Sequence, residues 1–339
     1  MATIYDVAKE AGVSIATVSK VINQTGRISE KTRQHVQEIM KNLNYQPSVV
    51  ASALTKKRTY TIGLLIPDLA NPFFAEIARS VEDRAHELGF NLVICNTDND
   101  LAKEERYTDL LRQKSADGII LATGVRSNTM LKKLMQQKQA IAVIARDMPS
   151  LAVDTVLVDD FLGGYLAASH LIELGHRHLA IITENLEVMS SRERLRGCRQ
   201  ALEEAGLVLE DKWVRVSAFD VQGGKQTAAS LLDEEHPPTA IFACNDLLGI
   251  GVIQAARERG LTVPRDLSVV GFDNTILATI IDPPLTTVAQ PIQELGRQIV
   301  DLISQEINGN KGSKQRVVLL PELVIRGSTG LYRPEQQSV

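Results

Sequence analysis

Residues 3–23 read TIYDVAKEAGVSIATVSKVIN, and this stretch predicts two short helices joined by a tight turn. Thr3 followed by Asp6 is typical of a capping box, which begins the first helix. Gly12 ends that helix, because glycine adopts the left-handed backbone conformation at little cost. Ser14 can then cap a second helix, whose inward side carries Val18, Val21 and Ile22.

A third helix capped by Ser29 would complete a small domain over residues 1–46. Its expected buried side chains are Val36, Ile39, Met40 and Leu43. Two helices that cross closely at a glycine turn form a helix-turn-helix, which inserts its second helix into the major groove of DNA. An ordinary helical hairpin is the simpler alternative, because such hairpins are common.

The outward side chains of the second helix are suited to reading base pairs. Lys20 can donate to a guanine edge, and Ile15 and Ala16 suit contact with thymine methyl groups. Phosphate contacts fix the register without reading sequence, and the residues best placed for them are Ser14, Thr17 and Asn23.

The net charge of −4 is divided unevenly along the chain. Residues 1–60 hold nine Lys or Arg against four acidic residues, which makes this segment +5 and leaves −9 on the remainder. A small basic segment before a larger acidic one is the distribution expected when only the first part meets nucleic acid.

Length and composition exclude several classes of protein. The 339 residues, 44% hydrophobic, are typical of a soluble globular chain of two or three domains. We see no apolar run of about 20 residues for a membrane span and no signal peptide, so we expect a cytoplasmic protein. A disulfide framework and paired zinc ligands are excluded because the three cysteines lie far apart, at Cys95, Cys198 and Cys244.

Residues 47–60 form a predicted linker that begins at Pro47 with a short helical stretch of small residues. A helix this short is marginal in water without support. From local sequence alone a plain interdomain linker is the better interpretation. The alternative is a leucine wedge in the minor groove, flanked by the basic side chains of Lys56, Lys57 and Arg58.

TIYDVAKEAGVSIATVSKVIN together with NYQPSVVASAL at residues 44–54 resembles the lactose-repressor/galactose-repressor family of bacterial transcription regulators. The resemblance runs to about residue 330. It implies a homodimer whose paired linker helices open the minor groove at the centre of a palindromic operator. It places Leu54 at the wedge and Ala51 and Ala53 in the hinge helix, and it leaves room for a phosphorylated carrier protein as corepressor.

From residue 61 onward, short β-branched runs alternate with helical stretches, which predicts an α/β fold of parallel sheets covered by helices. About 270 residues favour two sheets that share a cleft. The resemblance implies a periplasmic-binding-protein-like core whose chain crosses three times between two lobes, near Asp159, Gln290 and Pro321. We therefore expect one lobe to contain residues 61–159 and 291–320, and the other residues 160–289 and 322–330.

Ligands of open α/β sheets bind beyond the carboxyl ends of the strands, so polar and aromatic residues there are the candidates. A sugar needs flat apolar faces for its C–H groups and charged or amide groups for its hydroxyls. The first kind is expected from Phe73, Phe74 and Phe219. The second is expected from Asn71, Arg146, Arg194, Asn245, Asp273 and Gln290.

Eight of these positions, all except Arg146, match an aldose-type pocket of the sugar-binding proteins that the fold resembles. Ala145 departs from that pattern, which usually has an acid before the arginine, so a modified sugar, a sugar acid or a sugar phosphate stays open. Simpler interpretations are that Phe73 and Phe74 belong to the core and that Asn71 is only a helix cap.

Catalytic and cofactor motifs are not found. The glycines at 163–164 and 249–251 do not form a dinucleotide fingerprint, and there is no phosphate-binding loop or nucleophile elbow. We therefore expect neither an enzyme nor a cofactor or metal, but a DNA-binding regulator, most simply a repressor, controlled by a small carbohydrate-like effector. The alternatives are a sugar- or nucleotide-handling enzyme and a pure solute-binding protein.

Overall fold

The computed structural model describes residues 2–22, 25–45, 58–122, 134, 139–147, 152–310 and 312–333. The chain divides into two compact units, Met1–Thr61 with Arg112–Asp117, and Ile62–Leu111 with Gly118–Val339. Each unit is described by itself. Among the described helices, none is long and apolar enough to cross a membrane.

The described residues of the first unit form three helices, α1 (Ile4–Glu10), α2 (Ile15–Ile22) and α3 (Glu30–Asn42). The predicted capping box is confirmed, because Thr3 accepts from the Asp6 amide and Asp6 accepts from the Thr3 amide at 2.7 Å. Gly12 has a φ of +63° and ends α1, and the Ser14 hydroxyl accepts from the Thr17 amide at 3.1 Å. The buried core consists of Val7, Ala8, Ala11, Val18, Val21, Val36 and Ile39.

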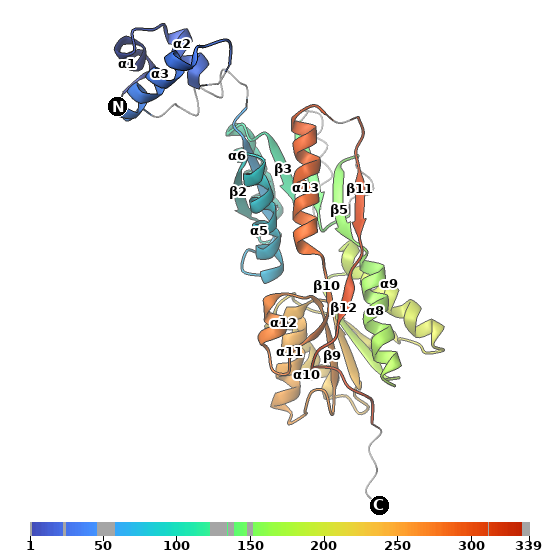
Figure 1. Ribbon diagram of the computed structural model, residues 1–339. Coiled ribbons are helices and arrows are strands. Elements are labelled where there is room, and N and C mark those ends of the chain that lie inside the picture. Colours follow the sequence, from blue (N-terminus) through green and yellow to red (C-terminus); the bar gives the residue numbers. More distant parts are fainter. Residues whose placement is uncertain are drawn as a thin grey trace, which may run out of the picture. The chain divides into compact units, whose positions relative to one another are not determined.

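The second unit contains two six-stranded sheets, which we call sheet A and sheet B (Figure 1). Sheet A has the order β11-β5-β4-β3-β1-β2. Its strands are β1 (Thr61–Ile66), β2 (Asn91–Asn96), β3 (Gly118–Leu121), β4 (Ala140–Ile144), β5 (Asp154–Val158) and β11 (Arg316–Leu319). We call sheet A and its helices lobe A. These helices are α5 (Pro72–Glu87), α6 (Leu101–Gln113) and α13 (Ile292–Ile307).

Sheet B has the order β12-β10-β9-β8-β6-β7 and forms lobe B. Its strands are β6 (Leu179–Thr183), β7 (Val214–Val216), β8 (Ala240–Ala243), β9 (Ser268–Asp273), β10 (Thr286–Ala289) and β12 (Glu322–Val324). Its helices are α8 (Asp160–Glu173), α9 (Met189–Glu204), α10 (Val221–Leu232), α11 (Asp246–Glu258) and α12 (Ile276–Ile280), with a 3-10 turn, η1 (Asp211–Trp213).

The predicted α/β fold with parallel sheets is confirmed, with one strand as an exception. β12 pairs antiparallel with β10, whereas β10 pairs parallel with β9. The cause lies in the connection: β11 of sheet A leads into β12 of sheet B through only Leu320 and Pro321. A chain that leaves sheet A at the carboxyl end of β11 enters sheet B from the cleft side, so it runs against the other strands.

Glycines allow two pairs of helices in lobe B to pack closely, which gives a structural role to the second glycine of the Gly163-Gly164 and Gly249-Ile250-Gly251 sequences. A Cβ at Gly164 of α8 would collide with the Arg194 carbonyl of α9, and one at Gly197 would collide with the Phe161 carbonyl. Gly251 of α11 meets α10 in the same way at the Val221 carbonyl. Close packing of α8 and α9 brings Arg194 within reach of α8.

Candidate DNA-binding face and interlobe cavity

The outer side of α2 carries the three residues that we predict to read bases. Ile15, Ala16 and Lys20 are all exposed, on the side opposite the buried Val18 and Val21. Their exposure means that the described structure leaves them open to a partner.

Of the three residues predicted to contact phosphate, two lie within the described residues. Ser14 and Thr17 lie at the start of α2, where their hydroxyls are 2.9 Å apart. Asn23 lies outside the described residues, as do the three hinge residues Ala51, Ala53 and Leu54. Their roles therefore stay predictions.

A cavity of about 280 Å³, which we call the interlobe cavity, lies at the carboxyl ends of strands from both sheets. It brings together four of the predicted effector residues, namely Asn71, Phe74, Arg146 and Phe219. Its other lining residues are Pro67, Asp68, Asn99, Glu184, Asn185, Val188 and Ser217. Glu184 and Ser217 follow β6 and β7 directly, so the strand-end argument could have found them.

Asn71 and Phe74 line the cavity, whereas Phe73 is part of the core of lobe A. Asn71 caps α5, because its Oδ1 accepts from the Phe73 amide at 3.1 Å, and it also lines the cavity. Phe73 packs edge-on against Phe74, with ring centroids 5.0 Å apart, and lies in the core of lobe A. Of these two rings, only Phe74 lines the cavity.

The remaining four predicted residues are buried in lobe B and do not line the cavity. Arg194 bonds Asp160 through an Nε–Oδ1 distance of 2.7 Å, donates to the Cys244 carbonyl, and lies 3.5 Å from the centroid of the Phe272 ring. It is therefore held on three sides before any ligand arrives.

The other three residues of this buried group are Asn245, Asp273 and Gln290. Gln290 Nε2 donates to Asp273 Oδ1 at 2.7 Å. Asn245 caps α11, since its Oδ1 accepts from the Leu248 amide at 2.7 Å, and its buried Nδ2 has no hydrogen-bond partner among the described residues. The group thus offers one free donor close to the ends of β8 and β9.

Burial dominates the electrostatics of this buried group. It raises the pKa of Asp273 well above the usual value, while the positive charge of Arg194 acts in the opposite direction. Burial also raises the pKa of Asp246 to about 6, against hydrogen bonds from Thr287 and Thr275. Asp273 has a φ of 108°, a strained conformation for a residue with a side chain, and such strain is typical of functional sites.

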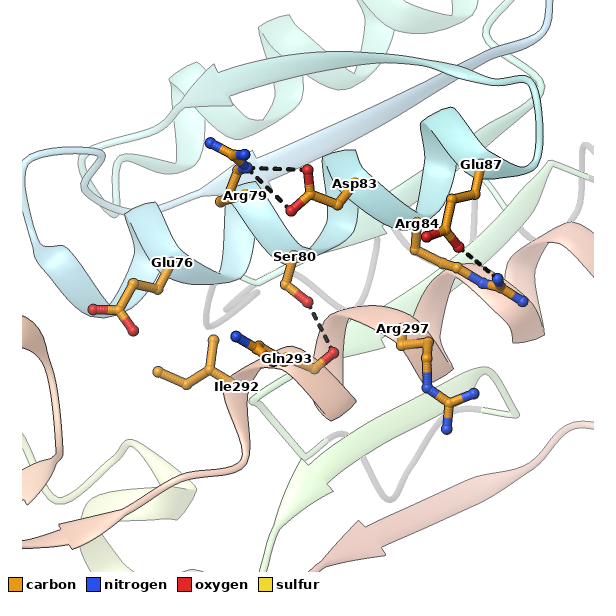
Figure 2. Close-up of a pocket in the computed structure, with 9 residues that line it drawn as sticks. All are labelled: Glu76, Arg79, Ser80, Asp83, Arg84, Glu87, Ile292, Gln293 and Arg297. Carbon is orange, nitrogen blue, oxygen red and sulfur yellow. Dashed lines mark hydrogen bonds and ion pairs between the residues drawn. The ribbon is translucent and has the colours of Figure 1, made fainter.

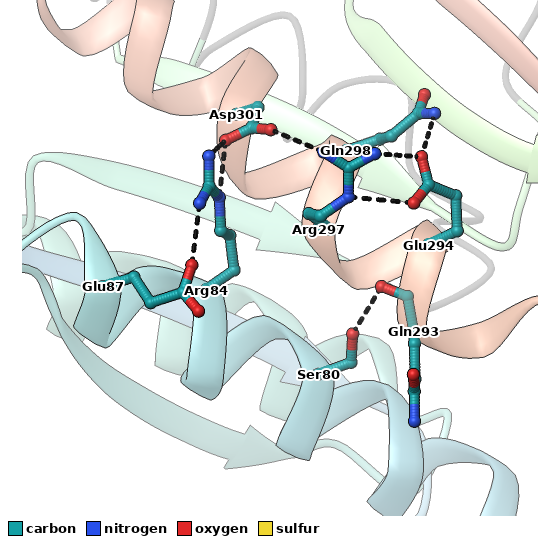
Figure 3. A network of polar contacts seen from close by, with 8 residues as sticks. All are labelled: Ser80, Arg84, Glu87, Gln293, Glu294, Arg297, Gln298 and Asp301. Carbon is teal, nitrogen blue, oxygen red and sulfur yellow. Dashed lines mark hydrogen bonds and ion pairs between the residues drawn. The ribbon is translucent and has the colours of Figure 1, made fainter.

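A further groove of about 360 Å³ lies between α5 and α13 of lobe A, and Figure 2 shows the side chains along it. Its arginines are engaged: Arg79 pairs with Asp83 at 3.0 Å, and Arg84 pairs with Glu87 and Asp301, each at 2.7 Å. Arg297 pairs with Glu294 at 2.6 Å, which completes the network in Figure 3. We call this surface the α5–α13 groove.

Within the described part of the chain, no group of three or more His, Cys, Asp or Glu could hold a metal ion. The three cysteines are buried and free. Burial raises the pKa of Cys198 and of Cys244 to about 12, so neither thiol is a nucleophile at neutral pH.

Comparisons with known protein families match both parts of the chain. Residues 3–48 match the family described as bacterial regulatory proteins, lacI family, and residues 168–329 match a periplasmic binding protein-like domain. The transcriptional regulator DegA of Bacillus subtilis is 51% identical over 96% of this chain and 98% of its own length. The transcriptional repressor PurR of Haemophilus influenzae is 39% identical over 97% of this chain and 98% of its own length.

Solved structures agree with these matches. A lac repressor dimer bound to operator and an anti-inducer superposes with a TM-score of 0.88 at 29% identity, over 97% of this chain and 99% of that one. A complex of the regulator CelR with cellobiose gives 0.75 at 32% identity, over 97% and 100%. The relatives are regulators rather than enzymes, and their likeness spans the whole molecule, so this chain belongs to the lacI family of bacterial DNA-binding transcription regulators.

Proposed function

We propose that this protein is a repressor that binds a palindromic operator as a homodimer, with an affinity set by a small carbohydrate-like ligand in the interlobe cavity. The observation that carries the proposal is the cavity itself, which combines two aromatic rings, Phe74 and Phe219, with amide and charged groups. This is the chemistry that binds the two faces and the hydroxyls of a sugar. CelR was solved with cellobiose, and a regulator of this family from Enterococcus faecium with ribose.

In the proposed DNA complex, Ile15, Ala16 and Lys20 read bases, while Ser14, Thr17 and Asn23 bind phosphates. Ala51, Ala53 and Leu54 belong to the hinge that opens the minor groove. Exposure of the first three side chains supports this assignment. Arg194, Asn245, Asp273 and Gln290 form the polar floor that a ligand would reach as the lobes adjust around it, with Phe73 supporting Phe74 from behind.

The homodimer is supported by exposed apolar side chains in both lobes. Val93 and Ile94 lie on β2, the edge strand of sheet A, and Ile276 and Ile280 lie on α12 of lobe B. An exposed apolar edge strand is a template for pairing with another chain, so we expect a second copy of this protein to bury these side chains. We expect Ile280→Arg to shift the molar mass in light scattering from dimer toward monomer, and an unchanged mass would place the contact elsewhere.

The α5–α13 groove gives no support to a phosphorylated protein corepressor. Each arginine that lines it already pairs with a carboxylate, so a phosphate would have to displace Asp83, Glu87 or Glu294. We therefore propose control through the interlobe cavity. Operator affinity that rises on addition of a phosphorylated carrier protein would overturn this part of the proposal.

The experiment that tests the proposed function begins with selection of binding sites from random DNA. The selected fragment is then titrated with the full chain while a panel of sugars is screened by thermal shift. We expect a palindromic site, and a sugar that both stabilises the protein and changes its affinity for that site. Catalytic turnover of a sugar or nucleotide would instead indicate an enzyme. Binding of sugar without binding of DNA would indicate a solute-binding protein.

A further inference from the structure

One ion pair joins the two lobes inside the interlobe cavity. Arg146 follows β4 of lobe A, and Glu184 follows β6 of lobe B. Their Nη1 and Oε1 atoms are 3.5 Å apart, and the two side chains are only 11% and 15% exposed. The lining of the cavity therefore contains a positive and a negative group, both largely buried, that face each other across the lobes.

This pair leaves hydrogen-bonding capacity unused. Arg146 Nη1 is buried and makes no hydrogen bond within the described part of the chain. A buried donor without an acceptor is costly, and the cost is removed when a ligand oxygen accepts from it. A hydroxyl both accepts and donates, so a single hydroxyl can accept from Arg146 and donate to Glu184.

The charges around the pair disfavour an anionic ligand. The charged residues that line the cavity are Asp68, Arg146 and Glu184, which sum to −1. An adjoining cavity of about 510 Å³ shares Arg146. It adds four carboxylates, from Asp147, Asp159, Asp160 and Glu193. Three of them are paired, Asp147 with Arg316 at 2.7 Å, Asp160 with Arg194 at 2.7 Å and Glu193 with Arg196 at 2.6 Å.

We propose that Glu184 is a specificity-determining residue, which restricts the cavity to uncharged polyhydroxylated ligands and rejects sugar acids and sugar phosphates. The inference rests on the proposed carbohydrate-binding function. A neutral sugar bridges Arg146 and Glu184 through a hydroxyl and so ties lobe A to lobe B. A carboxylate or a fully ionised phosphate can accept from Arg146, but it has no proton for Glu184 and places like charges together in a buried site, which discriminates against it.

The test is isothermal titration calorimetry of the full chain with matched ligands. The panel contains ribose and ribose 5-phosphate, glucose, gluconate and glucose 6-phosphate, and cellobiose and cellobionate. We expect a neutral member to bind at least tenfold more tightly than its anionic counterparts. Glu184→Gln keeps the size of the side chain but removes its charge. It should weaken the neutral ligand about tenfold and narrow the discrimination against anions to less than threefold, because charge-assisted hydrogen bonds are the stronger ones.

Two further variants keep the result interpretable. Glu187→Gln makes the same charge change three residues away on an exposed side chain that does not line the cavity, and it should behave as the unmodified chain. Glu184→Asp retains the charge and should retain most of the discrimination, even if Glu184→Gln folds poorly.

Each remaining outcome decides the question. An anionic sugar that binds as tightly as its neutral counterpart overturns the inference while the carbohydrate site stands. An unchanged ratio of affinities for neutral and anionic ligands in Glu184→Gln also overturns the inference. If no member binds and operator affinity ignores the whole panel, the proposed carbohydrate-binding function fails together with the inference.

Discussion

The helix-turn-helix unit and the interlobe cavity present their functional side chains in opposite ways. Ile15, Ala16 and Lys20 lie exposed on α2, above a small core that does not depend on them. Arg194, Asp273 and Gln290 are buried, and each already bonds another protein group. DNA can therefore be bound by adding contacts to a finished surface, whereas a ligand in the cleft must replace or complete internal contacts. Substitutions should separate the two regions by their effect on folding.

Arg194→Ala should have the largest effect on stability. It leaves Asp160 beside an empty site, and breaking a buried ion pair from one side costs about 3–5 kcal/mol of unfolding free energy. Arg196→Ala on the same helix removes an exposed pair with Glu193 and should cost less than about 1 kcal/mol. Urea unfolding of both variants checks this, and equal losses would contradict the contrast between buried and exposed pairs.

Asp246 should make the stability of lobe B fall as pH rises. Its pKa is about 6 in the folded chain against 3.8 in the unfolded one, so the folded state holds the extra proton between these values. The contribution is fully present below pH 3.8 and is lost as pH rises through 6, by roughly 3 kcal/mol at about 1.4 kcal/mol per pH unit. Asp246→Asn should lack this decline, so parallel unfolding curves for the two proteins between pH 4 and 7 would contradict it.

Lys20→Ala should weaken operator binding without changing stability. Loss of one good base contact costs about 1–3 kcal/mol of discrimination, and the exposed side chain contributes little to the core of the unit. Fluorescence anisotropy against the selected site and a scrambled site measures the effect, with the thermal midpoint as the control. An equal loss on both sequences would reassign Lys20 to the phosphate backbone.

Asn71→Ala should have a small effect on stability, and it separates a helix cap from a ligand contact. Loss of an N-cap costs about 1 kcal/mol. Asp220→Ala removes the corresponding cap of α10, where Asp220 accepts from the Gly223 amide at 2.7 Å outside the cavity. Both variants should lose similar stability in urea, but only Asn71→Ala should also lose ligand affinity in calorimetry. Equal ligand affinity in the two variants would show that Asn71 only caps α5.

Features that depend on a few neighbouring residues were predictable from the sequence. The caps at Thr3, Ser29 and Asn71 are present, and the glycine stop at Gly12 has the positive φ that ends a helix. The strand-end rule also located four of the residues that line the cavity, Asn71, Phe74, Arg146 and Phe219. These features need only local hydrogen bonds and backbone conformation, which the order of residues determines.

Features that depend on distant segments were not predictable in this way. Phe73 and Phe74 are adjacent on a helix, so they point about 100° apart, and only the packing of lobe A decides which ring reaches the cavity. Glu184 meets Arg146 only because the ends of β6 and β4 face each other. The antiparallel β12 likewise follows from the direction in which the chain enters sheet B.

Our proposal requires that ligand binding in the interlobe cavity and operator binding by the helix-turn-helix unit are thermodynamically linked. This linkage is tested by the operator dissociation constant of the full chain, measured by anisotropy with and without a saturating sugar that calorimetry has shown to bind. We expect a change of about 5–150-fold, the usual range for coupled sites, and its loss in Asp273→Asn. An operator affinity that stays the same while the cavity is filled would show that the two sites are not linked.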